Sequence, residues 1–84
     1  MTLEDLAKVV ADDFKATMLD EGFNSFAEMA RCYAWDSADI KDEVNAIIGS
    51  VDAYIDEVDG TEVIFDDDMI SYRKFSAMWH ALLK

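Results

Sequence analysis

The chain contains no proline, one histidine, one cysteine and only three glycines among its 84 residues. Its single cysteine, Cys32, cannot form an internal disulfide, which is typical of a protein kept in a reducing compartment. One cysteine and one histidine also fall short of the ligand set of a zinc site. No run approaches the roughly 18 apolar residues of a membrane span, and MTLEDLAKVV lacks the features of a secretory signal. We therefore expect a cytoplasmic protein.

Basic residues are scarce. Seven lysines and arginines face 19 acidic residues, which gives a net charge of −12. Because 52% of the residues are apolar, the chain is too hydrophobic for a disordered acidic tail and we expect one folded domain over residues 1–84. Nucleic acids and membrane surfaces are themselves anionic, so neither is an expected direct partner. The charge favours a basic protein surface as the partner.

The first half of the chain predicts two helices. Thr2 and Asp5 have the spacing of an N-terminal capping box, helical apolar spacing follows, and Gly22 supplies a left-handed C-terminal cap, so a helix is predicted over 3–21. Ser25 and Glu28 form a second capping box before a short helix at 26–34. Asp36 or Ser37 then caps the next helix.

The second half predicts two more helices. An apolar stripe at helical spacing indicates a third helix that ends at Asp59-Gly60, and it consists of Ile40, Val44, Ile47, Ile48, Val51, Tyr54, Ile55 and Val58. Residues 61–65 are rich in β-branched and aromatic residues, but a single strand has no pairing partner, so we expect an extended connector. The last helix is predicted to begin within DDDMISY, with its acids at the positive end of the helix dipole. The expected fold is all-α, a compact single-domain bundle of about four helices.

Catalytic and metal-binding patterns are absent from the sequence. The acidic stretch DEVDGTEVIFDDD suggests an EF-hand loop, but placing Gly60 at position 6 puts the apolar Ile55 at position 1 and Glu62 at position 8, so the register fails. No phosphate-binding loop or catalytic motif is present, and nothing local activates Cys32 or His80. We expect a protein that is not an enzyme and that needs no cofactor or metal.

The acidic residues are unevenly placed. From Asp42 to Tyr72 there is no lysine or arginine, whereas ten acids fall in that interval. In a helical reading, Asp52, Asp56 and Asp59 lie at i, i+4 and i+7 and form one ridge. Like charges at such spacing cost about 0.2–0.5 kcal/mol per pair. Their retention suggests that a partner supplies the compensating cations.

This combination resembles a class of known proteins. A short, strongly acidic helical chain with a carboxylate ridge such as Asp52, Asp56 and Asp59 is similar to small inhibitors encoded by phages and mobile elements, including anti-CRISPR and anti-restriction proteins. Some of these are DNA mimics. The resemblance covers the composition and the 42–68 segment. It implies an inhibitor that binds, without chemistry, to a basic nucleic-acid-binding surface of a nuclease.

Three other readings remain open from the residues. The acidic face can simply be solvated, the chain can be a helical regulatory or assembly subunit that docks through apolar surface, or Asp66–Asp68 can hold a divalent cation weakly. Trp35 is either part of the core or an exposed anchor of the kind that dominates interfaces. The candidate partner-binding residues are Asp52, Asp56, Glu57, Asp59, Glu62, Asp66, Asp67, Asp68 and Trp35.

Overall fold

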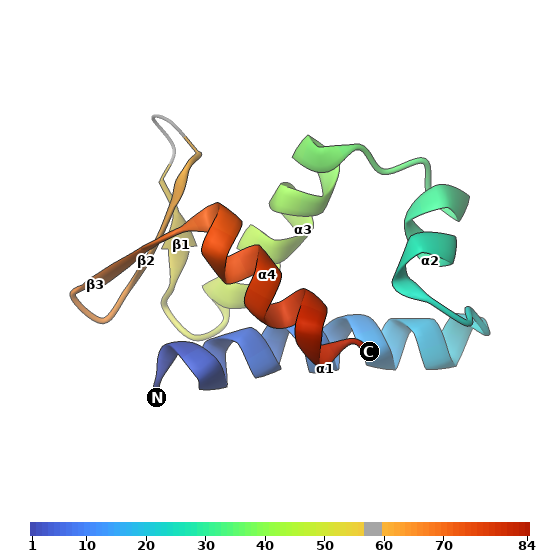
Figure 1. Cartoon of the computed structure of the whole chain (residues 1–84), viewed down its shortest axis with the longest axis horizontal. Helices are drawn as coiled ribbons and strands as arrows, with labels where there is room; N and C mark the ends of the chain where they lie inside the picture. Colours follow the sequence, from blue (N-terminus) through green and yellow to red (C-terminus); the bar gives the residue numbers. More distant parts are fainter. Residues whose placement is uncertain (57–59) are drawn as a thin grey trace.

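The computed structural model describes residues 1–56 and 60–84, and within them helices combine with a small sheet (Figure 1). In chain order the elements are α1 (Leu3–Glu21), α2 (Phe26–Cys32), α3 (Ser37–Gly49), β1 (Tyr54–Ile55), β2 (Glu62–Phe65), β3 (Asp68–Ser71) and α4 (Tyr72–Leu82). The expectation of an all-α bundle is therefore wrong. The fold is a helix-dominated α/β arrangement, because the segment after α3 folds as strands.

The helix α1 spans the predicted residues. The Asp5 backbone N–H donates to the Thr2 hydroxyl at 3.1 Å, and the Thr2 N–H donates to the Asp5 carboxylate at 3.0 Å, which completes the predicted capping box. These bonds, first that from the Thr2 backbone, lower the pKa of Asp5. At the other end Gly22 adopts a φ of 78°, the left-handed conformation that ends helices.

The helix α2 begins where predicted and ends at Cys32, two residues earlier than expected. Ser25 accepts from the Glu28 N–H at 3.1 Å, but the Glu28 carboxylate accepts from the Asn24 N–H and not from Ser25. Tyr33 is the C-cap of α2. The helix ends there because the next residue, Ala34, adopts the left-handed conformation, with a φ of 56°.

The helix α3 is nine residues shorter than the stripe through Val58 suggested, since it ends at Gly49. Asp36 caps its start in a reciprocal box with Asp39. At its end Ser50 is the C-cap, and Asp52 follows with a φ of 62°, which no helix accommodates. The residues beyond, although apolar at helical spacing, form a turn and then β1.

The three strands form an antiparallel sheet in the order β1-β2-β3. Ile64 lies between Tyr54 and Met69, and Val63 lies between Ile55 and Ile70. Asp66 and Asp67 connect β2 to β3 with φ values of 49° and 67°. Positive φ at both residues is what a two-residue type I′ hairpin requires, and aspartate tolerates it better than most residues. The predicted connector at 61–65 is thus a central strand.

The helix α4 begins at Tyr72, after the N-cap Ser71, whose hydroxyl accepts from the Lys74 N–H at 3.2 Å. The acids at 66–68 therefore do not lie in its first turn, contrary to the prediction; they make the hairpin turn and open β3. Phe75 and Trp79 of α4 are fully buried.

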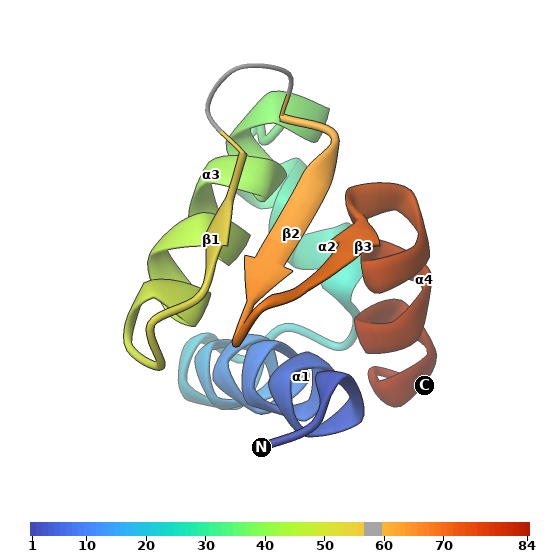
Figure 2. The same cartoon turned by 90° about the vertical axis from the view of Figure 1, so that its left-hand side faces the viewer.

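The core lies where α1 packs against α4 and α3, and the inner face of the sheet closes one end of it (Figures 1 and 2). At its centre the rings of Phe14 and Phe26 lie 5.2 and 5.3 Å from that of Trp79, measured between centroids. The sheet adds Ile55, Val63 and Phe65. The molecule extends over 37 × 25 × 20 Å, with the sheet and α2 at opposite ends of its long axis.

Candidate binding surface

The outer face of the sheet carries a row of apolar side chains, of which the two outer members are exposed and the central one is half-buried. Tyr54, Ile64 and Met69 are cross-strand neighbours on β1, β2 and β3. Because side chains alternate along a strand, this row points away from the buried row of Ile55 and Val63. Tyr54 is 52% exposed and Met69 is 63% exposed. Figure 2 looks onto this face, and no helix crosses in front of it.

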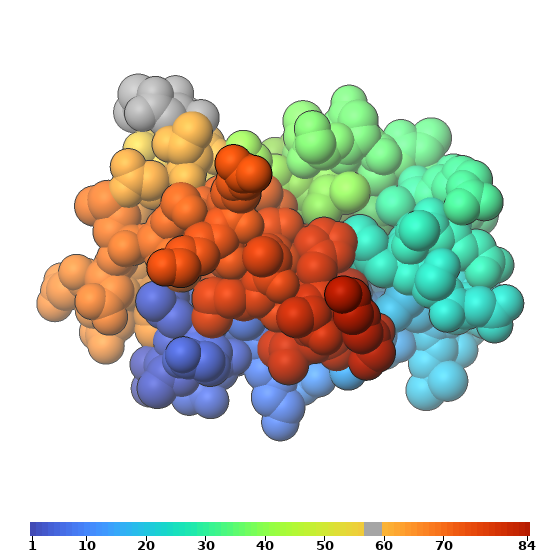
Figure 3. Space-filling model, viewed as in Figure 1, coloured from blue at the N-terminus to red at the C-terminus, as the bar shows by residue number. Residues whose placement is uncertain are grey.

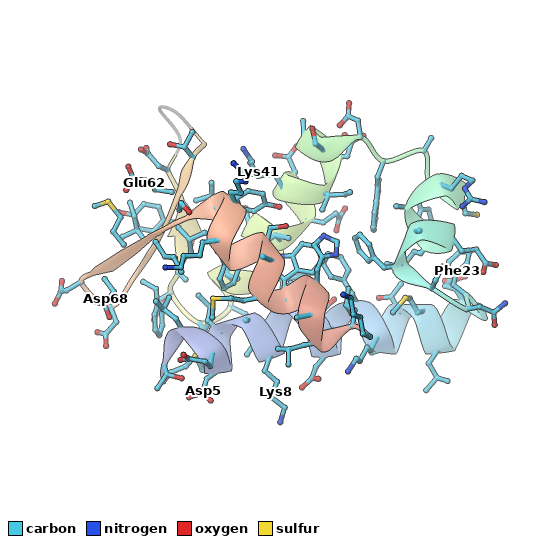
Figure 4. The ribbon with its side chains drawn as sticks, in the orientation of Figure 1. Asp5, Lys8, Phe23, Lys41, Glu62 and Asp68 are labelled. Carbon is cyan, nitrogen blue, oxygen red and sulfur yellow. The ribbon has the colours of Figure 1, made fainter. Side chains whose placement is uncertain are left out.

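Carboxylates surround this apolar row. Glu62 lies two residues before Ile64 on the same face of β2, and the exposed Asp66 and Asp67 form the hairpin turn. Asp68 is also exposed, but it pairs with the buried Phe65 and opens β3 on the other face of the sheet. Asp52 adds a further exposed carboxylate in the turn that leads into β1. Glu62 and Asp68 project from the two ends of the sheet in Figure 4. The result is an apolar centre with an acidic rim, which we call the sheet face.

The predicted carboxylate ridge does not exist as a helical feature. Asp52 sits in a turn with positive φ, and Asp56 follows β1, where its N–H donates to the Glu62 carbonyl at 2.9 Å. Glu57 and Asp59 lie outside the described residues. The structure nevertheless brings the remaining predicted acids to one end of the molecule, because the predicted helix end, the connector at 61–65 and the predicted start of the last helix together contain the three strands of the sheet.

Trp35 is not part of this surface. It lies between α2 and α3, toward the end opposite the sheet, and is half-buried. Its ring centroid lies 6.2 Å from that of Phe14 and 6.4 Å from that of Phe26, so one side of the indole packs onto the core. Its other contact is with Tyr33, at 5.1 Å.

The sequence reasoning missed the apolar row itself. The sequence patterns place Tyr54 in the apolar stripe of a helix, Ile64 in a connector and Met69 in the segment DDDMISY where the last helix is predicted to begin. The signal was the pattern Glu-Val-Ile-Phe-Asp-Asp-Asp-Met-Ile-Ser, where two aspartates separate two strand-forming runs. Aspartate pairs are less frequent in type I′ turns than Asn-Gly or Asp-Gly, so the hairpin was not recognised.

Lys41, on α3, contacts the chain that enters β2 and the first residue of α4. Its Nζ donates to the Gly60 carbonyl at 2.5 Å and lies 4.9 Å from the ring centroid of Tyr72. The cation is therefore engaged by α4 and by the chain entering β2. Burial raises the pKa of the Tyr72 phenol, and a hydrogen bond with Ser76 partly offsets that rise.

The described residues bring no cluster of metal-ligating side chains together. No group of three or more histidine, cysteine, aspartate or glutamate side chains among them is placed to hold a metal ion. A groove of about 490 Å³ between α3 and α4 is lined by charges of both signs, from Lys41, Arg73 and Asp42. Cys32 is exposed. None of the helices in residues 1–56 and 60–84 combines the length and apolar character needed to cross a bilayer.

No protein-family model, curated protein or solved structure matches the chain.

Proposed function

We propose that the chain is an acidic, non-enzymatic protein-binding module that acts in the cytoplasm and holds a basic protein surface against the sheet face. The observation that carries this proposal is the acidic rim around the apolar row of Tyr54, Ile64 and Met69. No lysine or arginine occurs anywhere from Asp52 to Ser71, the segment that contains the whole sheet. The nearby ammonium of Lys41 comes from α3 and is already bonded to the Gly60 carbonyl.

This arrangement matches the usual anatomy of an interface, in which a desolvated centre is surrounded by a polar rim. The exposed side chains of Tyr54 and Met69 supply area that a partner can remove from water. The carboxylates of the rim accelerate encounter with a basic surface and disfavour acidic ones. A partner with basic residues around an apolar patch is the complement.

The narrower form of the proposal is that the partner surface is one that binds nucleic acid, as in a host nuclease. The chain then acts as a nucleic-acid-mimicking inhibitor of the anti-CRISPR or anti-restriction kind. The net charge of −12 and the clustering of Asp66, Asp67 and Asp68 at one tip support this form. The carboxylates form a rim and not a straight ridge, so contact with the apolar row is expected to contribute alongside the charge.

The experiment is capture of partners from lysate over a salt series, with matched charge variants. Asp66→Asn with Asp67→Asn removes two rim charges but keeps residues that tolerate positive φ. Asp12→Asn with Asp13→Asn removes the same charge from the exposed side of α1. We expect the first pair to weaken capture and the second to leave it unchanged. Equal capture by both pairs would contradict the proposal, and competition by duplex DNA tests its narrower form.

The alternative of a regulatory or assembly subunit that docks through apolar surface has one observation in its favour, the 63% exposure of Met69. In that case Met69→Ser abolishes capture, whereas salt and the Asp66/Asp67 variants do not affect it. The same salt series therefore separates the two functions.

A further inference from the structure

Three aromatic rings line the surface at the end of the molecule opposite the sheet. Phe23 follows α1, Tyr33 caps α2 and Trp35 precedes α3. Tyr33 stacks on Trp35 with 5.1 Å between centroids and 28° between planes, and Phe23 meets Tyr33 at 5.8 Å and 71°. We call these three rings the aromatic ladder. Figure 4 shows Phe23 beside α2, and Figure 3 shows α2 at the far end from the β2–β3 hairpin.

The backbone adopts a costly conformation to build this ladder. Residues two apart do not face each other on a helix, so continuing α2 would separate Tyr33 from Trp35. Ala34, between them, instead takes a φ of 56°. A non-glycine residue held in this region costs roughly 1–3 kcal/mol and persists where the surroundings fix it. Here the Trp35 N–H donates to the Ala30 carbonyl at 2.9 Å, which locks the turn.

The inner side of the ladder packs on the core, and its outer side is exposed to solvent. The contacts of Trp35 with Phe14 and Phe26 tie it to the core. Tyr33 remains 44% exposed, although it is the middle ring. A preorganised aromatic surface loses little conformational entropy when a ligand binds. The ladder therefore has the order of a binding surface and not that of a set of independent surface side chains.

Acidic residues lie close to the aromatic ladder. The pKa of the Tyr33 phenol is raised above its usual value, first by partial removal from water and then by the neighbouring ionisable groups of Glu21, Cys32 and Asp20. Aromatic faces attract cations through the ring quadrupole, and nearby carboxylates add to that attraction. The chain does not satisfy this preference itself, because the cation–π pair found in the described residues is that of Lys41 with Tyr72.

We propose that the aromatic ladder of Phe23, Tyr33 and Trp35, with Asp20 and Glu21, is a binding site for an arginine side chain of a partner protein. A guanidinium is planar, weakly hydrated and able to stack on a ring while it bonds to a carboxylate, whereas a lysine ammonium is a strongly hydrated point charge. A second copy of this chain is a poor source of that arginine, since each copy carries a charge of −12. This site is separate from the sheet face and does not depend on the proposed function.

The test is an NMR titration of the ¹⁵N-labelled full chain with capped peptides. The probe is an arginine–glycine repeat, compared with the same repeat carrying lysine or citrulline, which is the uncharged analogue of arginine. We expect the indole N–H signal of Trp35 to shift with the arginine peptide, less with the lysine peptide and not with the citrulline peptide. The indole of Trp79, fully buried in the core, serves as the internal reference.

Matched variants make the test specific. Tyr33→Leu removes the middle ring, and Leu82→Ala removes a similarly exposed apolar side chain from α4, outside both surfaces. We expect Tyr33→Leu to weaken arginine-peptide binding about fivefold, as loss of an exposed cation–π contact does, and Leu82→Ala to leave it unchanged. Asp20→Asn with Glu21→Gln keeps every ring in place and is expected to weaken binding as well.

Two outcomes overturn the proposal. One is an equal Trp35 shift with the arginine and citrulline peptides. The other is wild-type affinity in the Asp20→Asn, Glu21→Gln double variant, which remains informative even if Tyr33→Leu disturbs the packing. Neither outcome bears on the sheet face, because the rim carboxylates and the apolar row are unchanged in that double variant.

Discussion

The side-chain Oδ1 of Asn45, on α3, accepts a hydrogen bond of 2.8 Å from the backbone N–H of Ile55, on β1. Because Asp56 bonds to β2 through its own N–H, the N–H of the preceding residue points away from the sheet. Asn45 thereby satisfies a donor on an edge strand that otherwise offers it to another chain. A side chain of α3 thus occupies a hydrogen-bond donor at the edge of the sheet.

The first prediction concerns this bond. Asn45→Ala removes the acceptor, which costs about 1 kcal/mol, but alanine is the better helix former, so the global stability changes little. We therefore expect the loss to be local, seen as faster hydrogen exchange of the Ile55 amide. Asn45→Asp retains an acceptor and is the control. Unchanged exchange at Ile55 in Asn45→Ala would show that the bond does not protect the edge.

The second prediction concerns the hairpin turn. Asp66 and Asp67 both have positive φ, for which Asn-Gly is the preferred pair. We expect Asp66→Asn with Asp67→Gly to raise the free energy of unfolding by about 0.5–1 kcal/mol, measured by urea denaturation. Asp12→Asn with Asp13→Asn removes the same charge from α1 and separates turn chemistry from charge relief. An equal gain in both variants would assign the effect to charge alone.

The third prediction concerns Lys41. Its bond to the Gly60 carbonyl and its contact with Tyr72 connect α3 to the start of β2 and to α4. Lys41→Met keeps the length of the side chain but loses both interactions, so we expect a loss of about 1–2 kcal/mol of unfolding free energy. Lys15→Met removes the same charge from an exposed position on α1 and is expected to be nearly neutral. Similar losses in the two variants would mean that Lys41 acts only through net charge.

The fourth prediction concerns pH. Partial removal from water lowers the pKa of His80 below its usual value of 6.5, and the charge of Lys84 lowers it further. The unfolded chain therefore takes up the proton more readily. This contribution to stability is complete above pH 6.5 and is lost as the pH falls from 6.5 through the folded-state pKa.

The corresponding variant is His80→Phe, which keeps a ring beside Trp79 and Phe26. We expect its unfolding free energy to depend less on pH than that of the wild type between about pH 7.5 and 5.5, where histidine titrates. Urea denaturation at several pH values measures the difference. Carboxylates contribute equally to both proteins. Identical pH dependence of the two unfolding free energies would therefore show that His80 does not contribute to it.

The parts of the fold that the sequence predicts are those where local signals agree. In α1 the capping box, the helical periodicity and Gly22 all indicate the same boundaries. In α3 they conflict. Val51 and Ile55 continue the helical spacing, yet they are β-branched residues that also suit a strand, and the positive φ of Asp52 that separates helix from sheet leaves no mark that periodicity can detect.

The sheet was missed because its strands depend on one another. The helical spacing of apolar residues continues through Tyr54 and Ile55, so the sequence shows no strand that could pair with β2 on this side. The aspartates at 66–68 suit the start of a helix as well as a turn. The sequence therefore does not reveal β3, the neighbour of β2 on the other side. The acidic character of the candidate site followed from composition, whereas its apolar centre exists only through cross-strand pairing.

The packing of α1 against α4 has a consequence for the order of events during synthesis. The apolar face of α1 emerges before α4 and can be covered only in part by α3 until α4 has emerged, because Phe75 and Trp79 complete the core that contains Leu6, Val10 and Phe14. The sheet and its hairpin are local in sequence, but the helical core requires contacts between distant segments, which form slowly. The protein is therefore expected to fold after translation of α4 and to expose α1 to chaperones until then.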